Sequence, residues 1–215
     1  MADFLWVERA RPTRGPKPAL TLDRIAAVAI AVADAEGLAA VSMQRVAADL
    51  GYTKMALYRY LPGKAELVAV MLERAIGEPP AVDGDWRERL TGWAAALLER
   101  YTRHPWAVEA TVGHRPIGPV ELTWMEVALA ALPPGLSGAE RLDAVATIAG
   151  HARAIAGQPP ESELVAAIGM VLRDHAERFP HLVAAVSEEG GRDQAFLFGL
   201  GRILDGLAAL IALRV

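Results

Sequence analysis

The sequence lacks cysteine entirely among its 215 residues. Disulfides, thiolate metal sites and cysteine nucleophiles are therefore excluded, which fits an intracellular protein. The amino-terminal stretch carries Asp3 and Glu8, where a signal peptide needs a basic start followed by an apolar run. The sequence also has no uncharged apolar run of about 18 residues, the length that a membrane-spanning helix needs. We therefore expect a cytoplasmic protein that does not enter a membrane.

Motifs of catalysis and metal binding are missing as well. The sequence has no G-x-S-x-G, no Walker A motif and no G-x-G-x-x-G placed after a strand. Its histidines include no pair at the H-x-x-x-H or H-E-x-x-H spacing of a metal site. Adjacent acids such as Glu188 and Glu189 are typical of solvated turns. We expect no enzyme activity, no metal and no cofactor.

The net charge of −4 is unevenly divided along the chain. Residues 1–64 hold nine Lys and Arg against six Asp and Glu, a net of +3, whereas residues 65–215 carry a net of −7. This asymmetry favours two functional regions, and a polyanionic partner suits the first. A chance division of charge is the alternative.

Hydrophobic residues make up 53% of the chain, enough for a buried core, and they recur at helical spacing. Thr21 and Ser42 are good N-caps for two of the periodic runs, and Gly37 and Gly51 end those runs. No alternation of polar and β-branched residues predicts a strand. The chain is predicted to be all-α, with helices over residues 22–36, 43–50, 54–61, 64–76, 86–103, 105–112, 119–131, 138–156, 161–178 and 192–213.

Proline and glycine divide the chain into three parts. Residues 1–20 form a basic, proline-rich arm, and residues 21–76 form a first helical domain. The turn-rich linker GEPPAVDG separates it from a second helical domain over residues 85–215.

The second and third predicted helices have the spacing of a helix-turn-helix. A helix that ends at Leu50 is followed by a glycine-containing break and a short helix. At 100° per residue, Ala56 and Leu57 fall on the core side of the short helix. The other side carries Lys54, Met55, Tyr58 and Arg59.

This exposed side has the residue types of a DNA-recognition helix. Such a helix needs cations and hydroxyls for phosphates and one or two side chains that reach base edges. Lys64 begins the next helix, where the helix dipole favours a phosphate. A solvated face on a structural helix corner is the alternative. The candidates for DNA contact are Gln44, Thr53, Lys54, Met55, Tyr58 and Lys64.

The arm RARPTRGPKPAL is the second feature that points to nucleic acid. Its three prolines predict an extended chain. We hypothesise that Arg11, Arg14 and Lys17 lie along the minor groove of double-stranded DNA. A disordered solubilising tail is the alternative.

The stretch LDRIAAVAIAVADAEGLAAVSMQRVAADLGYTKMALYRYLPGKAEL resembles the amino-terminal DNA-binding domain of tetracycline-repressor-like (TetR/AcrR) transcriptional regulators. The resemblance covers about residues 20–76. Its most specific parts are A-x-x-L-G at Ala47 to Gly51 and the following ALYRYLPGK, close to the family's ALYxHFxxK. FLFGLGRILDGLAALI, residues 196–211, is similar to the final helix of one branch of the family.

The resemblance implies a dimeric repressor, with an amino-terminal helix-turn-helix and a helical domain that binds a small molecule and dimerises. It also implies that Tyr60, which replaces a frequent histidine, meets DNA together with the six candidates named above. Tyr52 replaces a common small aliphatic residue.

Large flat side chains are concentrated between residues 86 and 131, enough to line an apolar pocket among helices. His151 is a candidate polar anchor. Ordinary core packing is the alternative for each of these residues. The candidates for ligand contact are Trp93, Tyr101, Trp106, Trp124, Met125 and His151.

The predicted helices over residues 138–156 and 192–213 mix small residues with aliphatic ones, which permits close helix approach. We expect them to form a two-fold four-helix interface in a homodimer. The recognition helices would then lie about 34–36 Å apart and read an imperfectly palindromic operator.

We therefore expect a dimeric transcriptional repressor that a small-molecule effector releases from its operator. The alternative from another class is a helical small-molecule-binding protein or enzyme whose helix-turn-helix corner is only structural. A regulator without a physiological ligand is a third reading.

Overall fold

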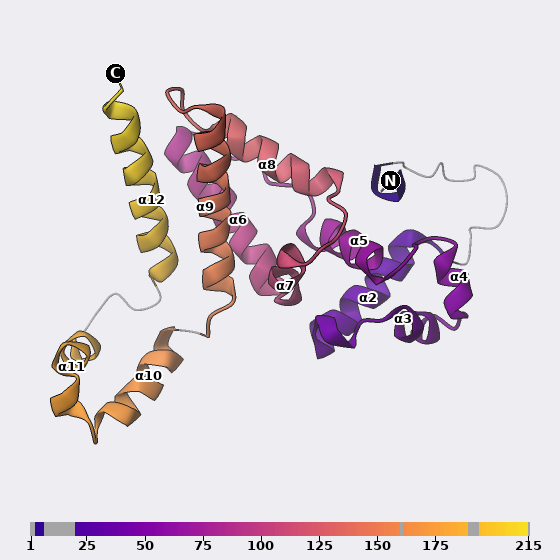
Figure 1. Cartoon of the computed structure of the whole chain (residues 1–215), viewed down its shortest axis with the longest axis horizontal. Coiled ribbons are helices and arrows are strands. Elements are labelled where there is room, and N and C mark those ends of the chain that lie inside the picture. Colours follow the sequence, from indigo (N-terminus) through magenta and orange to yellow (C-terminus); the bar gives the residue numbers. More distant parts are fainter. Residues whose placement is uncertain (1–2, 7–19, 160, 189–193, 215) are drawn as a thin grey trace.

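The computed structural model describes residues 3–6, 20–159, 161–188 and 194–214 (Figure 1). Every regular element within these ranges is a helix, which confirms the all-α prediction. In chain order they are α1 (Asp3–Trp6), α2 (Leu22–Glu36), η1 (Leu38–Ala40), α3 (Met43–Asp49), α4 (Lys54–Tyr58), α5 (Lys64–Ile76), α6 (Trp86–Arg103), α7 (Trp106–Val112), α8 (Pro119–Ala131), α9 (Gly138–Ala156), α10 (Glu161–Leu172), η2 (Ala176–Arg178), α11 (Pro180–Ser187) and α12 (Ala195–Ala212).

Helices α2 to α5, here called the amino-terminal group, form one end of the molecule (Figure 1). The Thr21 hydroxyl accepts a hydrogen bond from the backbone N–H of Arg24 at 3.2 Å, so α2 starts at the predicted cap. Helix α2 packs along α5, and Ile25, Leu67 and Met71 are fully buried in this group. The longer helices α2 and α5 thus share a buried core with the short helices α3 and α4.

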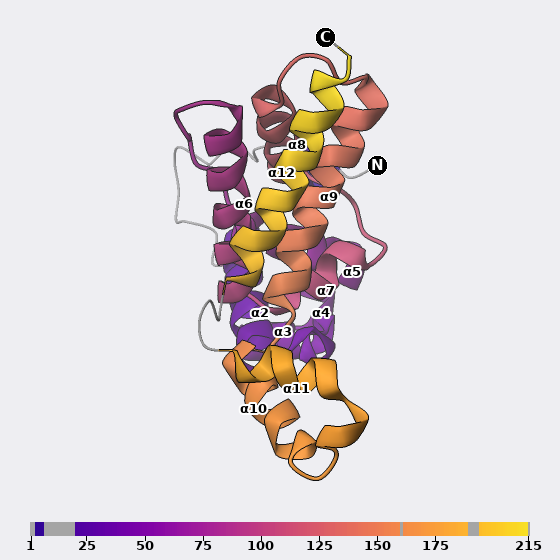
Figure 2. The same ribbon diagram turned by 90° about the vertical axis from the view of Figure 1, so that its left-hand side faces the viewer.

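The carboxy-terminal group is built from α6, α7, α8, α9 and α12. Helices α6 and α8 both pack on α9, and α12 runs beside α9 on the side away from the amino-terminal group (Figures 1 and 2). Leu90, Ile148 and Leu200 are buried between these helices. Helices α10 and α11 pack on each other and project beyond the end of α9 (Figure 1).

One predicted helix of the amino-terminal group ends well before its expected end. The third predicted helix was to run to residue 61, but α4 ends at Tyr58. The backbone N–H groups of Tyr60 and Leu61 turn back to the Leu57 carbonyl, at 2.8 and 3.0 Å. Pro62 disfavours helical conformation in the residue before it, so the last turn unwinds ahead of the proline.

The predicted helix over residues 161–178 is broken into α10 and the short η2. A further helix, α11, follows with Pro180 at its first position, and the sequence analysis did not predict it. Proline suits the first turn of a helix because its missing N–H needs no partner there.

Helix α12 is long and apolar enough to cross a membrane, with a mean hydropathy of 1.8 over 18 residues, of which 11% are buried. It also contains Arg202 and Asp205, whose side chains lie 2.5 Å apart. The core helix of a globular protein passes the same test of length and composition. Leu197 and Phe198 are 62% and 69% exposed, so part of its apolar face is uncovered in the single chain.

Candidate nucleic-acid interface and effector cavity

The turn between α3 and α4 is set by a cap, a glycine and a buried contact. The Ser42 hydroxyl accepts a hydrogen bond from the backbone N–H of Arg45 at 3.1 Å and so starts α3. Gly51 has φ of 75°, a conformation that favours glycine because it has no Cβ. Val46 and Leu57 are fully buried and pack α4 on α3. Helix α4 is thereby held with one side toward solvent.

The solvent side of α4 carries the predicted side chains. Lys54, Met55 and Tyr58 are exposed, Met55 to 71%, while Ala56 and Leu57 are buried. The predicted division of this helix into two faces is confirmed. Lys54 Nζ lies 5.5 Å from the centre of the Tyr58 ring, which places a cation and a phenol on one exposed patch.

The other DNA candidates differ in what surrounds them. Thr53 is the exposed N-cap of α4, and within the described part of the chain its side chain makes no capping hydrogen bond. Gln44 is exposed in the first turn of α3. Arg11, Arg14 and Lys17 lie outside the described residues.

Tyr60 and Lys64 make hydrogen bonds within the amino-terminal group. The Tyr60 hydroxyl donates to the Leu20 carbonyl at 2.9 Å, and Lys64 Nζ donates to the Leu38 carbonyl at 3.3 Å. The Tyr60 bond joins the end of the α4 turn to the segment that enters α2. This bond uses one of the three N–H donors of the Lys64 ammonium group.

Arg45 stands beside Gln44, yet the sequence analysis did not single it out. Its guanidinium contacts both Glu36 oxygens, at 2.8 and 3.2 Å, and its Nε lies 2.9 Å from Asp49 Oδ2. The hydrogen bond to Glu36 is the main cause of a raised Arg45 pKa. Glu36 therefore ties α3 to α2, and the two acids together neutralise the charge of Arg45. Only the Asp49 contact, at four residues' spacing, is visible from helical periodicity.

The two groups of helices are joined by polar contacts at three places. Asp34, near the end of α2, accepts a hydrogen bond from Trp106 Nε1 at 2.6 Å, and His104 Nδ1 lies 2.8 Å from the same oxygen. On the far side, Trp124 Nε1 donates to the Gly77 carbonyl at 2.7 Å. Trp106 therefore belongs to the junction between the groups, because its indole N–H is bound by an acid of α2.

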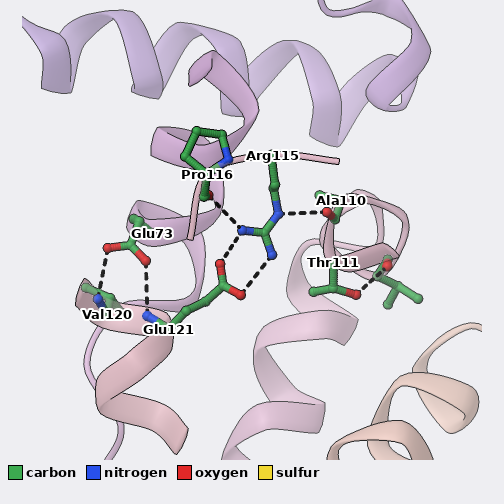
Figure 3. Close-up of polar contacts among 8 residues, drawn as sticks. Glu73, Ala110, Thr111, Arg115, Pro116, Val120 and Glu121 are labelled. Atoms are coloured by element: carbon green, nitrogen blue, oxygen red, sulfur yellow. Dashed lines mark hydrogen bonds and ion pairs between the residues drawn. The ribbon is translucent and has the colours of Figure 1, made fainter. Parts of the chain in front are cut away.

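Glu73 makes the third connection, from α5 to the start of α8 (Figure 3). Its side chain is buried, and its two oxygens accept hydrogen bonds from the backbone N–H groups of Val120 at 2.9 Å and Glu121 at 3.0 Å. Gly118 is required beside it, because a Cβ there would lie 2.2 Å from the carboxyl carbon. Burial raises the pKa of Glu73, against the opposing effect of the two N–H donors. A carboxylate from α5 thus caps α8.

Arg115 links the start of α8 to α7 within the carboxy-terminal group (Figure 3). Its side chain is only 6% exposed and is paired with the carboxylate of Glu121, one contact being 2.8 Å from Nη2 to Oε1. Its Nε donates to the Ala110 carbonyl at 2.8 Å, at the end of α7. The charge of Glu121 is therefore compensated within the protein.

A cavity of about 380 Å³ lies among α5, α6, α7, α8 and α9. Leu72 and Ile76 of α5 contribute to its wall, so the cavity reaches the amino-terminal group directly. Four of the predicted ligand residues line it, namely Trp93, Tyr101, Trp124 and Met125.

Trp106 and His151 do not line this cavity. The His151 ring stacks on Phe196 at a centroid distance of 5.7 Å, and its Nε2 lies 2.9 Å from the Phe196 carbonyl. A Cβ on Gly199 would lie 2.3 Å from the His151 ring. His151 is therefore occupied in packing α9 against α12, which the sequence pattern does not reveal.

The polar residues of the cavity were missed at the sequence level. Arg153 and Glu121 line it, as does the exposed Asp143. The Arg153 guanidinium lies by the Tyr101 hydroxyl and lowers its pKa through charge and a hydrogen bond, although burial has the larger effect and raises that pKa. No sequence signal pointed to Arg153, because which face of α9 lines the cavity is set by the packing of the helices. Among the described residues, no group of three His, Asp or Glu side chains is arranged to hold a metal.

Comparison with known proteins places this arrangement in a family. Residues 19–71 match the model described as "Bacterial regulatory proteins, tetR family", and residues 78–211 match "Tetracyclin repressor-like, C-terminal domain". The chain belongs to the TetR family. The resemblance seen in the sequence is confirmed, and the protein is a transcriptional regulator of a non-enzymatic family with a helix-turn-helix.

Individual TetR-family relatives agree with this assignment. The chain is 39% identical to the HTH-type transcriptional repressor DrrR1 of Streptomyces coeruleorubidus, over 99% of this chain and 86% of DrrR1. It is 29% identical to the tetracycline repressor protein class A from transposon 1721 of Escherichia coli, over 80% and 83% of the two chains. The structure of the TetR family protein ActR of Streptomyces coelicolor in complex with actinorhodin has a TM-score of 0.71 and 26% identity, with 91% of this chain and 98% of ActR covered.

Proposed function

We propose that this TetR-family regulator represses transcription as a homodimer in the cytoplasm and that a small molecule in the cavity releases it from DNA. The observation that carries the DNA site is the exposed face of α4, where Lys54, Met55 and Tyr58 stand on a helix whose other side is buried. This face offers a cation and a hydroxyl for phosphates and side chains for base edges. Thr53 and Gln44 extend it, and the arm and Lys64 add phosphate contacts.

The dimer interface that we propose is formed by α9 and α12 with their two-fold copies. Leu142 of α9 and Leu197 and Phe198 of α12 are between 49% and 69% exposed in the single chain. Apolar surface of this kind on adjacent helices suits a two-fold partner with the same face. An operator bound by such a dimer would be an imperfect palindrome.

Effector control requires that the cavity and α4 be connected, and the contacts between the groups supply the connection. Leu72 and Ile76 belong to both the cavity wall and α5, and Glu73 of the same helix caps α8. A ligand that fits only an arrangement with shifted α8 would therefore also shift α5 and the helices packed on it. Release then follows from the ligand's differential affinity for the two arrangements. ActR in complex with actinorhodin is a TetR-family relative with a bound small molecule.

Fluorescence anisotropy of a labelled duplex from upstream of the protein's own gene tests the DNA function. We expect binding that survives a scrambled competitor, with one or more dimers per duplex. Lys54→Ala should weaken binding by about 1–3 kcal/mol and change sequence preference. Arg103→Ala is the matched control, because Arg103 is an exposed residue of α6 that pairs with Glu99 of the same helix.

Weak binding that is equal for both duplexes and erased by salt would direct the search to a distant operator, by selection of bound genomic fragments. If that selection also returned no specific sequence, the proposal would fail. The helix-turn-helix would then be a structural corner in a small-molecule-binding protein.

A further inference from the structure

One wall of the cavity is made of two indole rings that are fixed in place. Trp93 Nε1 donates to the Trp124 carbonyl at 2.9 Å, and Trp124 Nε1 donates to the Gly77 carbonyl at 2.7 Å. The rings meet edge to face at a centroid distance of 5.8 Å. Since both N–H groups are used, these rings present only carbon surface to the cavity. A flat apolar molecule suits such a wall.

The charged residues that line the cavity are unevenly balanced. Glu121 is already compensated by the buried Arg115, and Asp143 is exposed, where water screens its charge. Among the described residues, Arg153 has no carboxylate partner at ion-pair distance. Among the cavity's charged residues, the guanidinium of half-buried Arg153 is therefore the one whose charge is neither paired with a carboxylate nor fully exposed to water.

Tyr101 adds a second donor beside this guanidinium. Its side chain is 4% exposed and lines the cavity. A guanidinium has no acceptor, so in the contact with Arg153 the Tyr101 oxygen accepts, and the phenolic hydrogen remains for another group. Because burial raises the pKa of Tyr101, the phenol keeps this hydrogen at neutral pH.

We propose that the effector of this regulator is a flat aromatic molecule with an anionic oxygen at one end, a carboxylate or an acidic phenolate, which Arg153 and Tyr101 bind together. The rings of Trp93 and Trp124 cover its apolar part. Charge-assisted hydrogen bonds to a partly desolvated guanidinium select the ionised oxygen over a neutral one. The proposal rests on the proposed role of the cavity as the effector site.

Isothermal titration calorimetry on the full chain without DNA tests this selection with three probes of equal aromatic area. They are naphthalene-2-carboxylate, the neutral ketone 2-acetonaphthone and the cation 2-naphthylmethylammonium. We expect the carboxylate to bind tightest and the ammonium weakest. Arg153→Met should weaken carboxylate binding by about tenfold or more, while ketone binding changes less. Tyr101→Phe, which removes only the hydroxyl, should weaken it by about three- to tenfold.

Arg103→Met is the matched control, because it removes the same charge from an exposed residue of α6 that pairs with Glu99. It should leave all three affinities unchanged. Equal binding of carboxylate and ketone, preference for the ammonium, or an unchanged order in a folded Arg153→Met would each overturn the proposal, as would no binding of the carboxylate. These titrations contain no DNA, so their failure is separate from a failure of operator binding.

Discussion

The amino-terminal group and the carboxy-terminal group leave different amounts of apolar surface exposed. Within α2 to α5 the large exposed apolar side chains are Met55 and Tyr58, both on the solvent side of α4. In the described residues after 85 many large apolar side chains are exposed, including Leu142, Phe179 and Phe198. The first group therefore buries nearly all of its large apolar side chains, and the two that stay exposed lie on the proposed DNA surface. The second group has apolar faces that a second copy of the chain would cover.

This difference matters for how the two groups respond to change. A substitution in the first group acts within one chain, on its fold or on its DNA surface. A substitution on the open faces of the second group should act mainly on assembly. A substitution in the polar contacts between the groups, such as Glu73 with the start of α8, should change both the stability of the fold and the coupling between the two groups.

Substitution of Leu57 should give the largest effect and sharpen the contrast within α4 itself. Leu57→Ala removes a fully buried side chain and should lower the free energy of unfolding by about 2–5 kcal/mol. Met55→Ala, two positions earlier on the exposed side, should change it by less than about 0.5 kcal/mol and yet weaken operator binding. Urea unfolding and anisotropy measured on both variants separate the two outcomes. A large loss of stability in Met55→Ala would contradict the division into two faces.

Substitution on α12 tests whether the second group depends on a partner chain. Phe198→Asp places a charge in the proposed interface and should raise the dimer dissociation constant by at least about 30-fold. Sedimentation velocity reports this change, and the helix content by circular dichroism should persist. Val112→Asp introduces the same charge at an 82% exposed residue at the end of α7 and should leave the dimer intact. If Phe198→Asp remained dimeric, α12 would not be the interface.

Glu73→Gln tests the connection between the groups. The amide supplies one acceptor where the carboxyl group supplies two, so the variant should lose about 1–3 kcal/mol of stability at about pH 5. Folding raises the Glu73 pKa above its ordinary value of 4.5, so the folded state binds more protons between those two values. The stabilising contribution of Glu73 therefore falls as pH rises through this interval, and the deficit of the variant should be smaller at about pH 8.

Urea unfolding of both proteins across this pH range measures the difference. Glu66→Gln, a substitution of the same kind in the first turn of α5, should show no such convergence with pH, since Glu66 takes no part in the α8 cap. A deficit of Glu73→Gln that grows with pH would contradict the raised pKa.

The sequence was most informative where the structure depends on near neighbours in the chain. Thr21 and Ser42 cap the helices predicted from them, and Gly51 ends α3 with a positive φ, because these effects act over three or four residues. The two faces of α4 follow from helical periodicity for the same reason. Helix α11 was missed because Pro180 is compatible with both the end of one helix and the start of another.

Contacts between distant residues had no such signal. Trp106 was grouped with the pocket because it is an aromatic residue near the others, but its partner is Asp34, 72 positions earlier. The Glu73 cap depends on Gly118 leaving space for a carboxylate from another helix. Which aromatic lines a cavity and which acid caps a helix are set by how the helices pack, and helical spacing carries no information on that packing.

The smallest expected effects distinguish Tyr58, a DNA candidate from its exposed position, from Tyr60, a DNA candidate from the family resemblance. Tyr58→Phe removes an exposed hydroxyl from the proposed DNA surface and should weaken operator binding by about 0.5–1.5 kcal/mol without changing stability. Tyr60→Phe removes the hydrogen bond to the Leu20 carbonyl, so it should lower the free energy of unfolding by a similar amount. Anisotropy and urea unfolding on the two variants form a crossed test. Tyr60→Phe could instead weaken operator binding as much as Tyr58→Phe, with no loss of stability. In that case the Tyr60 hydroxyl would leave the Leu20 carbonyl for a phosphate when DNA binds. Tyr60 would then contact DNA, as the family resemblance implies.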